Sequence, residues 1–484
     1  MCVCYARKTG ETMQVLAIES STSSAKAVLY DTEKGIVAGK QKAYGPDIDH
    51  LGMTDPVKVF ELSMEMARET AAGADVEAVA LCGTWHGICV CDSNINPVTP
   101  VYSWNFTGAS DICREIRKDA ELKEKLYRRT GCMPHSIYPR HVLQYLKAEG
   151  MPLEDKTFIT QGAYTFFRLT GEFAESASTQ SGTGVIRLGT KQYDPFVMDY
   201  IGVQERQFGQ IVTYRDTAPL SAEGAKLLGL KAGIPVVPAH PDGALNQIGN
   251  YAHKPGNMTL SVGTSGALRV SCTKPILPKG NELWCYLGAE NWISGAAVSG
   301  ACNCVNWFTD DFLGKRFSYT QLEEVEESKG HVPVFLPFLF GERCPGWDDE
   351  KRGGFVFVEP ETSVQQFYRG LQMGIIFNLY QCYEALVRED GVPEKIYVSG
   401  GITNSDRWLQ MLSDIFRKEI LVAEYPNASS MGAVALAMHA GGVLADLADF
   451  AEGAGDTRVY GPDESKYGWY ETEYGRYLDA YDRY

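Results

Sequence analysis

Two short turns rich in serine, threonine and glycine are the segments of this 484-residue chain best suited to bind phosphate. The first lies within residues 15–31, VLAIESSTSSAKAVLYD, and the second within residues 258–272, MTLSVGTSGALRVSC. Each segment has an apolar run before the turn and a partly alternating run after it, which predicts a β-hairpin. Successive backbone N–H groups in such a turn can bind phosphate oxygens. Two of these turns facing each other across a cleft would hold a polyphosphate.

The similarity of the two segments indicates an internal duplication. Aligning Thr22 with Thr264 places Ser23 opposite Ser265, and the offset of 264 − 22 = 242 residues is half of the 484-residue chain. Hairpins with similar turns recur by chance, but an offset of half the chain favours a duplicated architecture. The sequence therefore predicts two related halves, each with one turn.

The elements that would position the turns follow an α/β pattern. Asp55, which precedes a proline, is typical of a helix start, because its carboxylate can accept hydrogen bonds from the first free N–H groups. Towards the other end, a predicted strand over 395–398 stops at Gly400 and Gly401, and Ser405 then caps a second helix. We therefore expect strands and helices to alternate in both halves.

Both ends of the chain carry segments outside these halves. Tyrosines recur at spacings of three and four residues in the tail 451–484, which places them on one face of a helix. We expect this face to dock on the domain surface, and a homodimer contact is the alternative. Residues 1–12, which precede the strand-like segment after Met13, are expected to form a loosely attached N-terminal extension.

Composition and charge exclude several classes of protein. The 45 Lys and Arg residues against 61 Asp and Glu residues give a net charge of −16. A chain this acidic repels phosphate backbones and anionic lipids at long range, so neither nucleic acid nor a membrane is the expected partner. The scattered distribution of 13 cysteines favours a reducing cytoplasm. Cys89 and Cys91, two residues apart in an apolar run, are predicted to be buried thiols on one strand face.

Neither a Walker A loop nor a Gly-x-Gly-x-x-Gly loop occurs at a position where it could bind nucleotide. The chain instead resembles the FGGY family of carbohydrate kinases, in the sugar-kinase, actin and Hsp70 superfamily, over about residues 13–450. Five segments carry the resemblance in order: two phosphate motifs (15–31 and 261–267), a family signature (341–348, GERCPGWD), an adenosine motif (399–401) and the following Met-Gly-Ala (431–433).

The resemblance implies an α/β fold of two actin-like, or ribonuclease H-like, domains. Each would contain a mixed sheet flanked by helices, with the ligand cleft between the domains. The implied boundaries are 13–243 for an N-terminal sugar-binding domain, 244–450 for a C-terminal nucleotide-binding domain, and 451–484 for the tail with its tyrosine-rich helix.

The resemblance also assigns roles to individual residues. Asp242 is the implied catalytic base, since phosphoryl transfer needs a carboxylate that accepts the proton of the attacking hydroxyl. Glu19 stands where relatives usually carry Asp and is the implied ligand of Mg²⁺, through water. The implied nucleotide- and phosphate-binding residues are Thr22, Ser23, Lys26, Gly263, Thr264, Gly400, Gly401 and Ser405. The implied sugar-binding residues are Trp85, His86, Trp104 and Asp242.

Two departures from the family pattern affect these roles. Ser21 replaces the usual glycine in the first turn, so that turn must avoid a positive φ or adopt one at a cost. After Trp104, relatives often read Trp-x-Asp-x-Arg, whereas Phe106 and Gly108 occupy the Asp and Arg positions here. Losing two hydroxyl-binding groups should change which sugar is accepted.

Within the family, the chain looks most like the gluconate kinases. The segments that carry this likeness are 127–131, 242–249, 263–269 and 336–343. Val142 stands where relatives often carry lysine after Pro139. Arg140 and His141 would then be the residues that bind the carboxylate of a sugar acid.

The implied function is transfer of the γ-phosphoryl group of MgATP to a terminal hydroxyl of an open-chain sugar or sugar acid, with D-gluconate as the favoured substrate. A first alternative is a pentulose kinase of the xylulose type. A second class is an ATP-driven switch like actin or Hsp70, and a third is a sugar-binding protein without catalysis. ATP turnover that depends strictly on added sugar distinguishes a kinase from a switch.

Overall fold

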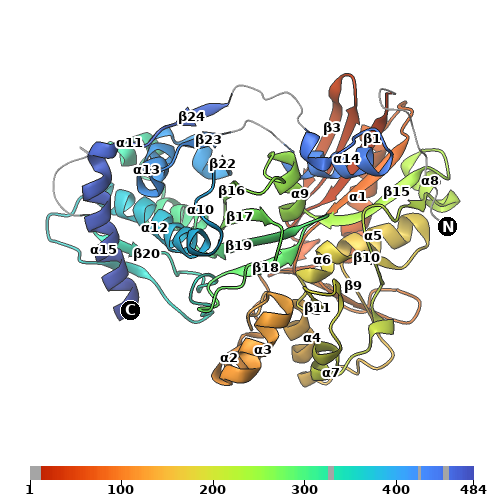
Figure 1. Cartoon of the computed structure of the whole chain (residues 1–484), viewed down its shortest axis with the longest axis horizontal. Coiled ribbons are helices and arrows are strands. Elements are labelled where there is room, and N and C mark those ends of the chain that lie inside the picture. The colour runs from red at the N-terminus through yellow and green to blue at the C-terminus, as the bar shows by residue number, and fades with distance from the viewer. Residues whose placement is uncertain (1–11, 325–331, 423–426, 451–456) are drawn as a thin grey trace.

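The computed structural model describes residues 12–324, 332–422, 427–450 and 457–484. Residues 1–11 of the predicted extension lie outside the described residues. Two mixed β-sheets with helices packed around them form the body of the molecule, one from each half of the chain (Figure 1).

The first sheet has six strands in the order β14-β15-β6-β1-β2-β3. Strand β1 pairs antiparallel with β2 and parallel with β6, and β6 pairs parallel with β15. The strands are β1 (Gln14–Ser20), β2 (Ser24–Asp31), β3 (Gly35–Ala43), β6 (Ala78–Gly83), β14 (Ala218–Pro219) and β15 (Pro235–Pro241).

The second sheet has seven strands in the order β18-β19-β17-β16-β22-β23-β24. Strand β16 pairs antiparallel with β17 and parallel with β22, and β22 pairs parallel with β23. The strands are β16 (Asn257–Val262), β17 (Gly266–Cys272), β18 (Trp284–Leu287), β19 (Trp292–Val298), β22 (Lys395–Ser399), β23 (Ile420–Val422) and β24 (Arg458–Tyr460).

The two sheets share a common pattern of strand pairing around their central strands, which supports the predicted duplication. In each, a central strand has two antiparallel neighbours in succession on one side and two parallel neighbours on the other, followed by an antiparallel edge strand. The second sheet has one further antiparallel strand, β18, beside β19. Moving β1 along the chain by 242 residues gives 256–262, which coincides with β16 to within one residue. The expected α/β fold with two mixed sheets is therefore confirmed.

Helices and short strands complete the two halves. Those up to the seam are α1 (Pro56–Thr70), α2 (Ser110–Lys118), α3 (Ala120–Thr130), α4 (Pro139–Ala148), α5 (Gln161–Thr170), α6 (Ala177–Ser181), α7 (Pro195–Ile201), α8 (Ala222–Leu228) and α9 (Asp242–Gly249), with the turn η1 (Glu205–Gln207). Those after it are α10 (Cys302–Asn306), α11 (Tyr319–Glu323), α12 (Val364–Asp390), α13 (Asp406–Phe416), α14 (Ala428–Ala440) and α15 (Tyr467–Arg483), with the turns η2 (Trp307–Phe312), η3 (Gly401–Asn404), η4 (Leu447–Asp449) and η5 (Glu464–Lys466). The short strands pair in small sheets: β4 (Asp49–His50), β5 (Met53–Thr54), β7 (Cys89–Cys91), β8 (Val101–Tyr102), β9 (Thr157–Ile159), β10 (Ala174–Ser176), β11 (Ile186–Arg187), β12 (Gln192–Tyr193), β13 (Gln210–Val212), β20 (Val334–Leu336) and β21 (Gly354–Val356).

Alternating side chains of β1 divide the first half into two packed layers, as the period of two in a strand requires. Leu16 and Ile18 belong to a core cluster shared with α1 and α5. Val15 and Ala17 belong to a second cluster shared with α9 and α14. Helix α14 thus packs on the first sheet although it lies late in the chain, and α9, against which α14 packs, touches strands of both sheets.

Local signals read from the sequence are found where they were predicted. The carboxylate of Asp55 accepts hydrogen bonds from two backbone N–H groups at the start of α1, and the hydroxyl of Ser405 accepts one from Trp408 in α13. Cys89 and Cys91 are buried thiols of one strand, with sulfur atoms 3.9 Å apart. Among the described residues, no helix is long and apolar enough to cross a membrane.

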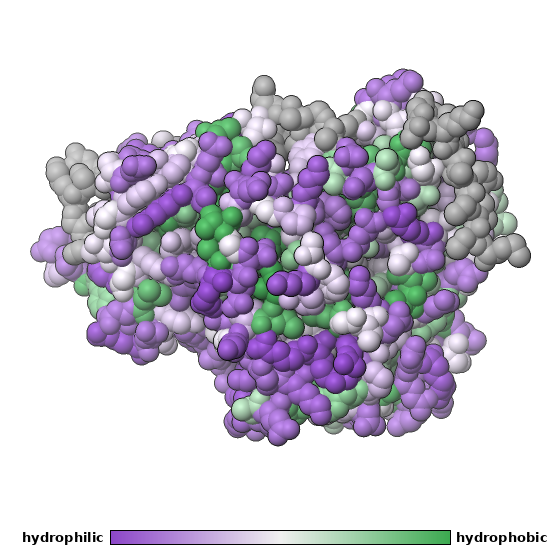
Figure 2. Space-filling view, in the orientation of Figure 1, coloured by the Kyte–Doolittle hydropathy of each residue, from purple (hydrophilic) through white to green (hydrophobic). Residues whose placement is uncertain are grey.

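The surface in the view of Figure 1 is mainly polar. Figure 2 shows polar residues covering the lobe around α2 and α3, and hydrophobic residues reaching this face in small, separate patches. Charged residues dominate α2 and α3, whose sequences are SDICREIRK and AELKEKLYRRT. This lobe therefore projects into solvent from the first half.

The tyrosine face of α15 docks on the second half, as predicted. Tyr477 is fully buried, and its ring lies 5.6 Å from that of Phe377 in α12. The hydroxyl of Tyr474 donates to Glu384 of the same helix at 2.6 Å. The buried face of α15 is thus part of the core of the second half.

Replacing Tyr477 with alanine should lower the free energy of unfolding by about 3 kcal/mol, because it leaves a large cavity between α12 and α15. The measurement is urea unfolding followed by circular dichroism. Tyr484→Ala is the matched control, since the Tyr484 side chain is largely exposed and its loss should change stability by less than about 0.5 kcal/mol. Equal effects of the two substitutions would contradict the docking of α15.

Candidate active site

The first turn, between β1 and β2, is braced by its own serine hydroxyl. The backbone N–H of Ser21 and its hydroxyl both donate to the carbonyl of Ser24, at 3.0 and 2.8 Å. None of Ser21, Thr22 and Ser23 has a positive φ. The replacement of glycine by Ser21 is therefore accommodated without backbone strain, and Ser23 remains exposed at the tip.

The second turn, between β16 and β17, is braced by the start of α10. The N–H of Cys302 donates to the carbonyl of Gly263 at 2.8 Å, and that of Asn303 donates to the carbonyl of Thr264 at 3.2 Å. Thr264 is exposed, and the space beside the Cα of Gly263 is open. Both turns thus keep an exposed residue at their tips, as binding of a phosphate would require.

A pocket of about 210 Å³ lies at the seam of the two halves, and we call it the central pocket. Five predicted residues line it together: Thr22, Trp85, His86, Trp104 and Asp242. Its other lining residues are Thr84, Ile137, Ser265, Ala267, Arg269, Trp284, Tyr286, Ala297, Arg343 and Trp347. The remaining predicted residues, Glu19, Ser23, Lys26, Gly263, Thr264, Gly400, Gly401 and Ser405, lie outside this lining.

Asp242 stands where β15 ends and α9 begins. The N–H of Gly243 donates to its Oδ1 atom at 2.7 Å. Burial raises the pKa of the Asp242 carboxyl to about 6, and Glu19 acts in the same direction, while Arg269 and Lys26 oppose them. This carboxyl is therefore ionised at neutral pH and still has appreciable affinity for a proton.

Trp85 fixes the start of α9 by close packing. Its indole N–H donates to the carbonyl of Ser178 at 2.9 Å. A Cβ atom on Gly243 would lie 2.3 Å from Cζ3 of Trp85, and one on Gly182 would lie 2.4 Å from its Cδ1. Only glycine fits at these two positions, so Trp85 determines where the backbone beside Asp242 can lie.

His86 is held in its neutral form. Its Nδ1–H donates to the carbonyl of Gly182 at 2.6 Å, which leaves Nε2 as a hydrogen-bond acceptor. Burial lowers the pKa of the imidazole to about 3. A neutral acceptor on the pocket wall suits a sugar hydroxyl better than an anion.

Two arginines of the central pocket were missed by the sequence analysis. Arg269 lines the pocket, and its Nε is buried without a hydrogen-bond partner among the described residues. Arg343 donates to the carbonyl of Val298 at 2.9 Å, and its Nε is likewise buried and unpaired in the described part of the chain. The alternation of Ala267 and Arg269 along β17, continuing the spacing from Ser265 in the turn, is the signal that could have revealed Arg269.

The arrangement after Trp104 explains the departure from the family pattern. The indole N–H of Trp104 donates to the hydroxyl of Thr22 at 3.2 Å, and the guanidinium of Arg343 lies over its ring at 5.3 Å. Phe106 does not line the central pocket but packs edge-on against Tyr102 and Tyr145. The lost Asp position therefore became part of a neighbouring aromatic cluster.

The suggestion that Arg140 and His141 bind a sugar carboxylate is wrong. Arg140 is fully buried, and its guanidinium donates to Thr130, to the carbonyls of Cys132 and Gly184, and to His141. Both side chains lie outside the lining of the central pocket. Because the donors of Arg140 already have partners inside the protein, this arginine is a structural residue.

The buried Glu19 and the partly buried Lys26 form an ion pair on the first hairpin, with Lys26 Nζ 3.5 Å from Oε2 of Glu19. The hydroxyls of Ser429 and Ser430, in α14, donate to the same oxygen at 2.9 and 2.6 Å. Oε1 of Glu19 has no bonding partner within the part of the chain that the structure describes. One free carboxylate oxygen fits a Mg²⁺ ion that keeps several waters and takes its other ligands from phosphates.

The predicted adenosine segment lies beside the second turn. Gly400 has φ +94°, and a Cβ there would lie 2.5 Å from the carbonyl oxygen of Val262 and 3.0 Å from the nitrogen of Gly263. Gly400 is thus required where β16 and β22 end together. The hydroxyl of Ser405 donates to Glu323 at 2.6 Å, so it is engaged within the protein.

The chain matches the sequence models of both domains of the FGGY family of carbohydrate kinases. The model of the N-terminal domain matches residues 14–249, and that of the C-terminal domain matches residues 258–441. The resemblance inferred from the motifs is therefore confirmed.

Relatives named as gluconate kinases and relatives named as xylulose kinases are both similar to this chain over nearly its whole length. A gluconokinase of Bacillus subtilis (strain 168) is 27% identical, over 94% of this chain and 92% of its own. A xylulose kinase of the same organism is 25% identical over 90% of both chains. The crystal structure of a gluconate kinase from Lactobacillus acidophilus is 25% identical with a TM-score of 0.91 over 98% of both chains. That of a ligand-bound xylulose kinase from Lactobacillus acidophilus has the same identity and TM-score over 97% of this chain and 98% of its own.

Replacing Gly243 with alanine should displace Trp85 or the start of α9 and cost about 1–3 kcal/mol of stability, because the added methyl group has no room. Tryptophan fluorescence and thermal unfolding measure the two effects. Gly475→Ala is the matched control, since a Cβ at Gly475 in α15 meets open space. An unchanged emission spectrum and melting temperature for the Gly243 variant would contradict the packing described here.

Proposed function

This chain belongs to the FGGY family of carbohydrate kinases, and from that premise we propose that it transfers the γ-phosphoryl group of ATP to a terminal hydroxyl of a sugar acid, D-gluconate. The transfer of a phosphoryl group to a sugar follows from the family. The choice of a sugar acid is the finer part of the proposal, and it rests on the charges of the central pocket.

The observation that carries the proposal is the pair of arginines in that pocket. Arg269 and Arg343 bring two guanidinium groups, against the single carboxylate of Asp242, while His86 is neutral. Each arginine has a buried Nε–H without a partner among the described residues. Buried donors are costly unless they are hydrogen-bonded, and guanidinium groups suit carboxylates in particular. A substrate carboxylate would satisfy both donors and balance the charge.

Xylulose remains the second candidate, because the xylulose kinases of Bacillus subtilis and Lactobacillus acidophilus are nearly as similar to this chain as the gluconate enzymes. A neutral ketose would leave the two arginine donors to water. The net positive charge of the pocket lining therefore favours the acid over the ketose.

Asp242 would act as the general base of the reaction. Its carboxylate would accept the proton of the sugar hydroxyl as the hydroxyl oxygen forms a bond to the γ-phosphorus. The bond from that phosphorus to the bridging oxygen would break at the same time, and ADP would leave. The neutral Nε2 of His86 can accept a hydrogen bond from another hydroxyl and orient the substrate. The aromatic faces of Trp85, Trp284 and Tyr286 form an apolar wall that restricts water.

The two turns would bind the phosphates of ATP through backbone N–H groups and hydroxyls. The residues assigned to this role are Thr22, Ser23, Gly263 and Thr264, with Lys26 near the first turn and Gly400, Gly401 and Ser405 on the side of the adenosine. Glu19 would hold Mg²⁺ through water, and the bound ion would neutralise charge on the phosphates.

Replacing Asp242 with asparagine should lower kcat by about 10²–10⁴-fold and leave the affinity for ATP nearly unchanged, because the variant loses the proton acceptor and keeps the turns. In the unchanged protein, kcat/KM should fall as the pH drops below about 6, since protonation of the raised Asp242 carboxyl removes the base. Coupled ADP-release assays across pH 5–8 measure both effects.

His240→Gln serves as the control for this region, because His240 is buried beside Asp242 in the chain and lies outside the pocket lining. The His240→Gln variant should show the same fall in kcat/KM below about pH 6 as the unchanged protein. Normal turnover of Asp242→Asn would exclude Asp242 as the base. A constant kcat/KM of the unchanged protein down to pH 5 would exclude a raised pKa of the Asp242 carboxyl.

Replacing Arg269 with glutamine should lower kcat/KM for gluconate by about 10- to 100-fold, the cost of a hydrogen bond to a charged group. The same variant should lose less activity with a neutral polyol such as glucitol, because only the loss of the Arg269 effect on the pKa of Asp242 applies to that substrate. The two substrates differ in the carboxylate and share the hydroxyl pattern, so their ratio isolates recognition of the anion.

Arg168→Gln is the control, because Arg168 lies on α5 outside the central pocket. Equal losses for gluconate and glucitol in Arg269→Gln would contradict carboxylate recognition by Arg269. Activity with xylulose but none with gluconate in the unchanged protein would replace the sugar acid by the ketose.

A further inference from the structure

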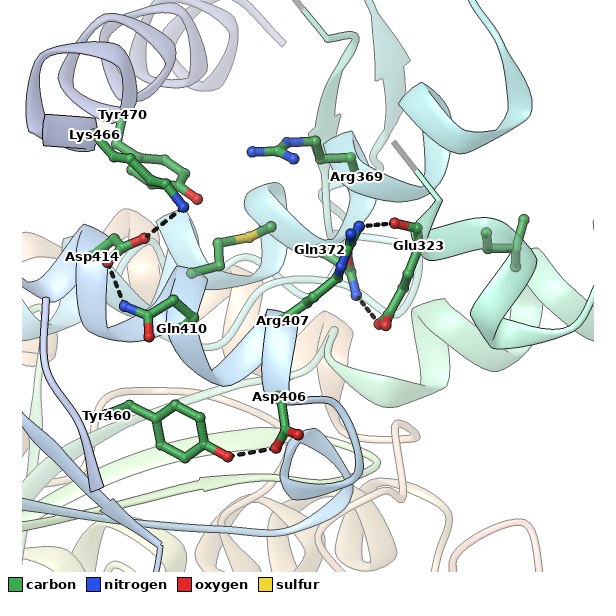
Figure 3. Close-up of a pocket in the computed structure, with 12 residues that line it drawn as sticks. Glu323, Arg369, Gln372, Asp406, Arg407, Gln410, Asp414, Tyr460, Lys466 and Tyr470 are labelled. Atoms are coloured by element: carbon green, nitrogen blue, oxygen red, sulfur yellow. Dashed lines mark hydrogen bonds and ion pairs between the residues drawn. The ribbon is translucent and has the colours of Figure 1, made fainter. Parts of the chain in front are cut away.

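A second pocket of about 280 Å³ lies between α11, α12, α13 and α15 in the second half, and we call it the helical pocket (Figure 3). Its mainly apolar lining residues are Leu322, Met411 and Tyr470. The other lining residues have charged or polar side chains: Glu323, Arg369, Gln372, Asp406, Arg407, Gln410, Asp414, Tyr460 and Lys466. None of these residues lines the central pocket or belongs to the two turns.

Arg369 is a buried cation without a hydrogen-bonding partner in the described part of the chain. Its side chain is only 8% exposed, and its Nε is buried and unpaired. The guanidinium lies 4.8 Å from the ring centroid of Trp469, but this contact uses its face and leaves the N–H groups at its edge unbonded. Figure 3 shows the group extending into the pocket on the side of Lys466 and Tyr470, with no bond drawn.

Asp414 supplies a buried carboxylate in the same pocket. Its Oδ1 accepts from the side chain of Gln410 and from the N–H of Asp463, both at 2.8 Å. Its Oδ2 makes no hydrogen bond among the described residues and forms an ion pair with Lys466, whose Nζ lies 4.0 Å away. The helical pocket thus offers a buried donor group without a hydrogen bond and a carboxylate oxygen held only by a long ion pair.

A hydrogen-bond network connects the helical pocket to the predicted adenosine segment. The side chain of Glu323 accepts from Gln372 at 3.2 Å and from the hydroxyl of Ser405 at 2.6 Å, and its carbonyl accepts from Arg407. Ser405 is the residue that caps α13 directly after the turn η3. A change at Glu323 therefore acts on the start of α13.

We propose that the helical pocket binds a small phosphorylated polyol as a second ligand, and that this ligand changes the affinity for ATP. The phosphate would satisfy Arg369 next to Lys466, and a hydroxyl group of the polyol would donate to Oδ2 of Asp414. Burial makes such charge-assisted hydrogen bonds strong, and unpaired buried groups are otherwise costly. The proposal is independent of which sugar the central pocket accepts.

Calorimetric titration with glucose 6-phosphate tests the binding, in saturating MgADP so that the two turns are already occupied. The unchanged protein should bind one equivalent, and Arg369→Met should bind about tenfold more weakly or worse, since methionine keeps the packing on Trp469 and loses the charge. Arg369→Lys, which keeps the charge, should bind glucose 6-phosphate with intermediate affinity. This variant provides the test if Arg369→Met does not fold.

Arg388→Met is the matched control, because Arg388 lies on the same helix α12 outside the helical pocket and is exposed. It should bind glucose 6-phosphate like the unchanged protein. No binding to the unchanged protein, or equal binding to the Arg369 and Arg388 variants, would overturn the site. Equal affinity for inorganic phosphate would overturn the assignment of a polyol hydroxyl to Asp414.

Kinetics test the coupling to the nucleotide. Glucose 6-phosphate should change the KM for ATP by about fivefold in the unchanged protein and in Arg388→Met, and should leave it constant in Arg369→Met. A constant KM in all three proteins would overturn the coupling. Because the binding test uses no sugar acceptor, its outcome is separate from the success or failure of gluconate as a substrate.

Discussion

The site depends on the electrostatic interaction between Asp242 and Arg269 across the seam of the two halves. Asp242 follows the last strand of the first sheet, and Arg269 lies on β17 of the second. Burial and Glu19 favour the protonated carboxyl, whereas Arg269 favours the carboxylate, and the balance gives a pKa of about 6. Because α9 begins at Asp242 and touches both sheets, its packing fixes the relative position of Asp242 and Arg269, on which the pKa of Asp242 depends.

The fold could be predicted because a duplication leaves its period in the sequence. The two hairpins, read as 15–31 and 258–272, became β1-β2 and β16-β17. Helix caps at Asp55 and Ser405 were readable because capping depends on a local side chain and its neighbours. Packing of α14 on the first sheet was not readable, because a helix of small residues gives no sign of which sheet will cover it.

The candidate site was only partly predictable. Trp85, His86 and Asp242 were found because the family motifs mark them, and they do meet in one pocket. Arg269 and Arg343 were missed because an arginine in a strand or a loop is normally solvated, and only tertiary packing buries their Nε atoms. Arg140 was misjudged for the same reason, since its partners at Thr130, Cys132 and Gly184 are brought together by tertiary packing.

The net charge of −16 and the cationic central pocket act over different distances. The acidic chain repels anions at long range, but salt screens exposed charges beyond about 8 Å at physiological ionic strength. Inside the pocket, low polarity strengthens the interaction of Arg269 and Arg343 with an anion and makes their unpaired state costly. A long polyanion would remain exposed to the acidic surface, whereas a small anion can be enclosed by the pocket. For the proposed sugar-acid substrate, this charge distribution would favour a small anion by enclosure, without long-range attraction.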